Sequence, residues 1–164
     1  MVDQTLYLTG WGTYFEVTDE YYEDCYETNY SYYCTNTYTM DNPTRTGIVT
    51  NVRVSFDGYA RPTYNGHQDG KTAIYSSGRS LVFGSAHALS MYPGSTYYTD
   101  YALNPWTGVG WTWDDIDALE AGFSLISDSG TSYAGSDSTA LALIVTSVPS
   151  SPGGCGQIIG FGGW

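Results

Sequence analysis

The sequence predicts an all-β protein, a jelly-roll or concanavalin-like antiparallel β-sandwich with one short helix at about residues 112–121. Among 164 residues there are 17 Tyr, 5 Trp and 5 Phe, side chains that favour strands, and 20 Gly, which favour turns. Strong helix formers are scarce, and Lys71 is the single lysine. The length suits one domain over residues 1–148, followed by a Gly-rich C-terminal arm over residues 149–164.

Strands are expected to make up most of the domain. Residues 48–56 alternate with the two-residue period of a strand, which places Ile48, Val52, Val54 and Phe56 on one face. Residues 139–148 are nearly continuous in apolar side chains, as is typical of a strand in the centre of a sandwich. Further strands are expected at 5–17 (two short strands hinged near Gly10), 30–40, 72–75, 80–84 and 96–103.

The predicted helix begins after Thr112, a residue type that caps helices through its side-chain oxygen. Asp115, three residues further on, completes an acidic variant of the capping box, and acidic residues crowd the first turn, where the helix dipole favours negative charge. Gly122 supplies a stop signal. The apolar stripe predicted for this helix consists of Ile116, Leu119 and Phe123.

An acidic, Tyr- and Cys-rich insert occupies about residues 16–34. Its carboxylates offer the oxygen ligands that calcium prefers, and the alternative is an acidic loop exposed to solvent. The candidate calcium ligands are Asp19, Glu20, Glu23 and Asp24. Tyrosines in the insert would pack across a subunit interface, stack on sugars or cover a sheet. The candidate interface residues of the insert are Tyr21, Tyr22 and Tyr26.

The three cysteines cannot all pair within one chain. Cys25 and Cys34 are expected to form a disulfide if their Cα atoms lie within about 7 Å of each other. Cys155, in the arm, is then either free or bonded between subunits. The sequence contains no C-x-x-C or H-x-x-H spacing, so a zinc site is not expected.

The charge restricts the partners. Seventeen acidic residues against five basic ones give a net charge of −12. Such a surface repels phosphate groups, so neither nucleic acid nor a membrane is an expected partner. No apolar run approaches the roughly 20 residues that span a bilayer. The N-terminus lacks a secretory signal, so either a signal was removed or the protein leaves its cell by another route, as a virion protein released by lysis does.

No catalytic site is expected. A nucleophilic triad needs a histidine base, and only His67 and His87 are available, with no G-x-S-x-G sequence. His67 falls in a turn, and His87 lies among small residues. Paired carboxylates for glycoside hydrolysis are a further alternative, but the acidic residues gather in the insert and at the start of the helix rather than on facing strands.

One segment resembles a known signature. Residues 104–122, NPWTGVGWTWDDIDALEAG, resemble the pattern N-P-x-T-G-x-x-W-T-x-x-D-I-D-A-L-x-A-G of a widespread group of phage, prophage and archaeal virus-like proteins. The resemblance extends over residues 5–148 and leaves out the insert and the arm. It implies a sandwich used in virions or other surface structures, with Trp111 and Thr112 in architectural roles and no catalytic residues.

These observations predict a non-enzymatic structural subunit that assembles with copies of itself in a virion (capsid, decoration or tail) or in an extracellular filament. Other virion proteins are further candidate partners. The alternative is a carbohydrate-binding or adhesive surface module for glycans, with calcium as the candidate ion and no other cofactor. In the first case the arm contacts a neighbouring subunit through its apolar side chains, Ile158, Ile159, Phe161 and Trp164.

Overall fold

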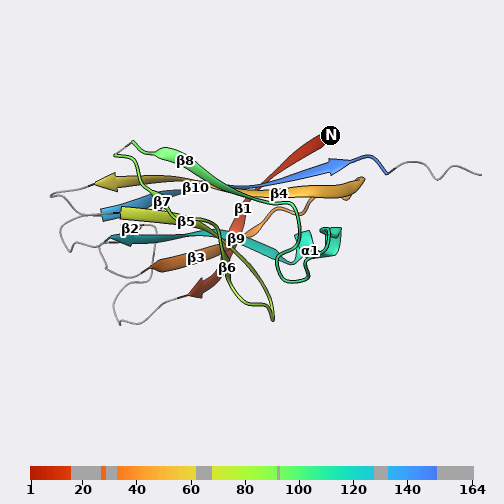
Figure 1. Ribbon diagram of the computed structural model, residues 1–164, viewed down its shortest axis with the longest axis horizontal. Coiled ribbons are helices and arrows are strands. Elements are labelled where there is room, and N and C mark those ends of the chain that lie inside the picture. Colours follow the sequence, from red (N-terminus) through yellow and green to blue (C-terminus); the bar gives the residue numbers. More distant parts are fainter. Residues whose placement is uncertain (16–26, 29–32, 62–67, 92, 128–132, 151–164) are drawn as a thin grey trace, which may run out of the picture.

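The computed structural model describes residues 1–15, 27–28, 33–61, 68–91, 93–127 and 133–150 (Figure 1). These residues form antiparallel sheets and one short helix, which confirms the predicted all-β sandwich. In chain order the elements are β1 (Val2–Phe15), β2 (Glu27–Thr28), β3 (Cys34–Met40), β4 (Ile48–Arg61), β5 (Gln68–Ser76), β6 (Val82–Phe83), β7 (His87–Ala88), β8 (Ser95–Tyr101), α1 (Trp113–Asp117), β9 (Leu119–Ser127) and β10 (Tyr133–Val148).

Two sheets are linked through β1. Residues 2–7 of β1 pair with β10 in the β4–β10 sheet, which has the order β1-β10-β4-β8. Residues 8–15 pair with β3 in the β5–β9 sheet, which has the order β6-β5-β9-β3-β1. A register shift between Leu8 and Gly10 accompanies the change of sheet. The hinge expected near Gly10 is therefore the point at which one long strand passes from one sheet to the other.

The core lies between the inner faces of the two sheets. Val52, Val54 and Phe56 of β4 are fully buried, as the alternation predicts. Phe56 stacks on Phe123 of β9, with ring centroids 5.7 Å apart, and so joins the sheets. Burying a side chain of this size stabilises a fold by about 1.5–3 kcal/mol. Other fully buried apolar side chains come from β5, β9 and β10: Ile74, Leu125, Leu143 and Val145.

Residues 82–91 bridge the two sheets. The backbone N–H of Gly84 donates to the oxygen of Thr72 on β5, over 3.0 Å. At the other end of the bridge, the N–H of Ala60 on β4 donates to the oxygen of Ser90, over 2.8 Å. This bridge covers the edge of β5, and covered edges do not pair with other chains.

The helix is shorter than predicted. Its N-terminal cap is confirmed, because the Thr112 hydroxyl accepts from the backbone N–H of Asp115 and the Asp115 carboxylate accepts from that of Thr112. The predicted C-terminal stop is wrong, since α1 ends at Asp117 and β9 begins at Leu119.

Gly122 lies inside β9, opposite Thr37 of β3. A Cβ atom at Gly122 would collide with the backbone oxygen of Asn36, so glycine here permits close approach of two strands. Leu119 and Phe123 are buried as strand residues rather than as part of a helical stripe.

The start of β4 differs from the predicted alternation. Ile48 is exposed and Val49 is buried, the reverse of the expected faces. Asn51 pairs with Thr146 and Val49 pairs with Ser147. Between these two pairs β4 advances by two residues and β10 by one, so β4 contains one extra residue. This β-bulge reverses the faces before and after it.

Candidate functional site

Most of the predicted site residues lie outside the described residues, and the predictions made for them stay predictions. These are the candidate calcium ligands Asp19, Glu20, Glu23 and Asp24, the insert tyrosines Tyr21, Tyr22 and Tyr26, and the arm residues Ile158, Ile159, Phe161 and Trp164. Within the part of the chain that the structure describes, no group of three or more His, Cys, Asp or Glu side chains is placed to hold a metal ion.

The end of the insert that the structure describes is anchored to the sandwich. Cys34 is buried and disulfide-bonded. Its two candidate partners, Cys25 and Cys155, lie outside the described residues, so the pairing with Cys25 stays a prediction. Next to Cys34, the ring of Tyr33 lies against the ammonium group of Lys71 on β5, with the nitrogen 3.4 Å from the ring centroid. Burial, with a smaller contribution from the charge of a nearby carboxylate, raises the pKa of Tyr33.

The signature segment forms a rigid corner after β8. Asn104, which is buried, accepts a hydrogen bond on its side-chain oxygen from the backbone N–H of Trp106, over 3.0 Å. Its own backbone N–H donates to the oxygen of Val109 and its backbone oxygen accepts from Gly108, both over 2.8 Å. Gly108 has a φ of 71°, a conformation that glycine adopts without strain. Residues 104–109 are thus a closed turn that presents the side chain of Val109 to solvent.

Three tryptophans fasten this corner to the sandwich. Each indole N–H donates to a backbone oxygen: Trp106 to Ser80 (2.7 Å), Trp111 to Tyr101 (2.8 Å) and Trp113 to Gly47 (2.9 Å). The rings of Trp106 and Trp111 meet edge to face, with centroids 6.3 Å apart. These three tryptophans therefore contact the chain itself, in structural roles.

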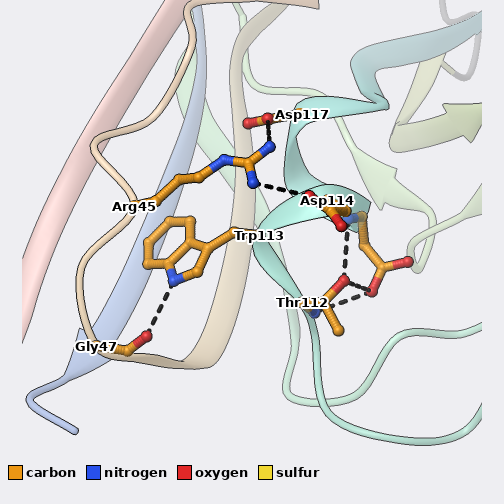
Figure 2. A network of polar contacts seen from close by, with 7 residues as sticks. Arg45, Gly47, Thr112, Trp113, Asp114 and Asp117 are labelled. Carbon is orange, nitrogen blue, oxygen red and sulfur yellow. Dashed lines mark hydrogen bonds and ion pairs between the residues drawn. The ribbon is translucent and has the colours of Figure 1, made fainter.

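Charged contacts complete the corner (Figure 2). The guanidinium of Arg45, from the connection between β3 and β4, pairs with the Asp117 carboxylate and lies 2.8 Å from the Asp114 carboxylate. These two contacts, that with Asp117 above all, raise the pKa of Arg45. Burial alone would raise the pKa of Asp115, but hydrogen bonds from Thr112 and Asn104, together with the charge of Arg79, lower it. Arg45 and Asp114 are largely exposed, so their ion pair contributes little to stability.

Five exposed apolar residues lie at one end of the β4–β10 sheet or just beyond it, and the register places two of them, Val2 and Ile48, on opposite faces. At this end β1 and β4 begin and β8 and β10 finish (Figure 1). The structure describes eight exposed large apolar side chains, and five of them belong to this end. We call these five the apolar end: Met1, Val2, Ile48, Leu103 and Val109.

The arm leaves the domain at the apolar end. β10 runs between β1 and β4, and its last residues pair with Val2 on one side and Ile48 on the other. At Gly47, whose φ is 74°, a Cβ atom would collide with the backbone oxygen of Val148, so glycine allows this connection to pack against the base of the arm.

A second surface feature lies on the outer face of β4 and β8. Arg53 donates two hydrogen bonds to the carboxylate of Asp100, over 2.8 and 2.7 Å, and Asn51 donates a third, over 2.8 Å. The guanidinium carbon of Arg53 lies 4.2 Å from the ring centroid of Tyr98, a half-exposed side chain. The hydrogen bonds from Arg53 lower the pKa of Asp100. We call these four residues the β4–β8 cluster.

Comparison of the chain with protein-family models, with curated proteins and with solved structures finds no match. Among the described residues, no helix has the length and hydropathy needed to cross a membrane. Neither the apolar end nor the β4–β8 cluster was predicted from the sequence. The signal for the apolar end was the presence of Leu103 and Val109 on either side of the N-P-x-T-G turn, where polar residues are usual.

Proposed function

We propose that this protein is a non-enzymatic structural subunit that assembles with copies of itself, in a virion or in an extracellular filament. The observation that carries the proposal is the apolar end. Single apolar side chains scattered over a surface are normal, but a concentration of them at one place is typical of an interaction site. Here five of the eight exposed large apolar side chains that the structure describes belong to the end at which the arm leaves, and the sequence of the arm contains four more.

The rigidity of the apolar end favours the proposal. Leu103 and Val109 flank the hydrogen-bonded turn of the corner, which the tryptophans hold against β8 and Gly47. A surface that keeps its shape loses little conformational entropy when a partner binds. The acidic body explains why assembly would use an apolar contact, because bodies of net charge −12 repel one another.

The direct test is the size of the purified protein, by light scattering and negative-stain microscopy. We expect regular assemblies. The same measurement with EDTA and with a reductant separates the contributions of calcium and of disulfide bonds, since assembly that depends on either would be lost. A stable monomer under every condition would refute the proposal.

A matched pair of variants locates the contact. Val109 and Met91 are equally exposed, each at 62%, but Met91 bridges to Ala60 near the opposite end of β4. We expect Val109→Asp to abolish assembly and Met91→Asp to leave it intact, with both variants folded by circular dichroism. Equal assembly of the two variants would contradict a role for the apolar end.

The β4–β8 cluster favours a second candidate function, a carbohydrate-binding module. A half-exposed ring beside planar polar side chains held in place offers a stacking surface and hydrogen-bonding groups for a sugar. Because the chain is acidic, the ligand would be a neutral glycan. A glycan array followed by titration tests this: Tyr98→Ala should abolish binding, whereas Phe83→Ala, a control at another exposed ring, should not. Binding that is unaffected by Tyr98→Ala would exclude this surface.

A further inference from the structure

We propose that the partner of the apolar end is the C-terminal arm of a second copy of this chain, so that subunits are linked by arms. This inference rests on the proposed function and adds to it the two surfaces that meet. The donor is the arm, through Ile158, Ile159, Phe161 and Trp164, and the acceptor is the apolar end around Ile48.

The position of the arm favours this pairing. Its first residues, Pro149 and Ser150, follow directly on Val148, whose partner on β4 is Ile48. Each subunit therefore carries the donor and the acceptor at the same end of the sandwich. The arm of one copy can therefore reach the acceptor of a second copy without contact between the two bodies.

The length of the arm allows it to contact a second copy. The 14 residues after Ser150 extend to at most about 50 Å. The first apolar residue, Ile158, follows a spacer of Ser, Pro, Gly, Cys and Gln, which by this measure extends to about 25 Å. Val2 and Ile48 flank the last residues of β10, so they lie within a few ångströms of the base of the arm. A spacer of this length can reach past its own apolar end to that of a second copy.

Charge favours the arm over a direct contact between two bodies. Residues 149–164 contain no charged side chain, although the whole chain has a net charge of −12. The apolar end itself lies beside Asp114 and Asp117, which Arg45 only partly neutralises. A contact between two bodies would bring these carboxylates together, whereas an arm without charged side chains can link two bodies that do not touch.

Two variants of the full chain test the pairing. In the donor-deficient variant, the four large apolar residues of the arm are replaced by serine, which keeps the length of the arm and Cys155. In the acceptor-deficient variant, Ile48, 58% exposed, is replaced by aspartate. Met91→Asp serves again as the surface control. Native mass spectrometry gives the mass of each protein alone and of the two variants mixed in equal amounts.

We expect each variant alone to be a monomer and the mixture to form a dimer of one copy of each, because only one donor and one acceptor remain. Assembly of the donor-deficient variant like the intact protein would overturn the inference and leave the proposed function standing, since the ends would then meet directly. A mixture that stays monomeric would also overturn it. An intact protein that is itself monomeric would instead refute the proposed function.

Discussion

Replacing Gly122 by alanine adds a methyl group between β9 and β3, in the middle of the β5–β9 sheet. The added Cβ would collide with the backbone oxygen of Asn36 and lie 2.7 Å from the Cα of Thr37. These are backbone atoms, so no side chain can rotate to make room, and the two strands must separate. Overpacking a core costs about 1–3 kcal/mol, and we expect a loss near the upper end of that range because the obstacle is backbone.

Gly110→Ala is the matched control. No atom lies within 4 Å of a Cβ at Gly110, and its φ is not positive. Alanine there should stabilise the protein by about 0.4–1 kcal/mol, because it restricts the unfolded chain. The same unfolded-state term applies at Gly122, so the difference between the two variants isolates the collision and should be about 3 kcal/mol.

Urea unfolding followed by tryptophan fluorescence measures both variants, provided that the m-value stays constant. If Gly122 instead ended a helix over residues 112–121 in a left-handed conformation, alanine would cost about 1–2 kcal/mol. Free energies of unfolding that agree within about 0.5 kcal/mol for the two variants would refute the placement of Gly122 in β9.

Three further predictions concern the corner and the β4–β8 cluster. Thr112→Ala removes the cap of α1 and should cost about 1 kcal/mol, whereas Thr112→Ser should cost much less; urea unfolding distinguishes them. Trp111→Phe leaves the backbone oxygen of Tyr101 without its donor and should cost about 1–3 kcal/mol by the same measurement. The folded-state pKa of Asp100 is lowered, so its pair with Arg53 adds stability above the ordinary carboxyl pKa of about 3.9 and loses it as the pH falls through the folded-state pKa. Both side chains are about 40% exposed, so that contribution should stay below about 1 kcal/mol. An NMR titration of the Asp100 carboxyl carbon should show the lowered pKa and its return towards 3.9 in Arg53→Gln; an ordinary pKa in the intact protein would contradict the ion pair.

Local patterns predicted the fold class and the centre of the main strands. The alternation of Val52, Val54 and Phe56 and the apolar run of β10 record which face of each strand is buried. The capping box at Thr112 involves residues three apart in the sequence, so the start of α1 could also be predicted. These features depend on neighbours in the chain, and the sequence therefore shows them.

Features that depend on a distant strand could not be predicted in this way. Ile116, Leu119 and Phe123 have the spacing of a helical stripe, and the contact of Gly122 with β3 decides that Leu119 and Phe123 belong to a strand. The bulge that exposes Ile48 is set by its register with β10. The apolar end has the same origin, because it joins residues from the N-terminus, from the start of β4 and from the corner, which only the pairing of β1, β4, β8 and β10 brings to one end of the sheet.

Sedimentation velocity of the intact protein over a wide range of concentrations tests the central claim most directly. The proposed function predicts species heavier than the 17.9 kDa of one chain, with a population that grows with concentration. Sedimentation as a single 17.9 kDa species at every concentration would contradict it.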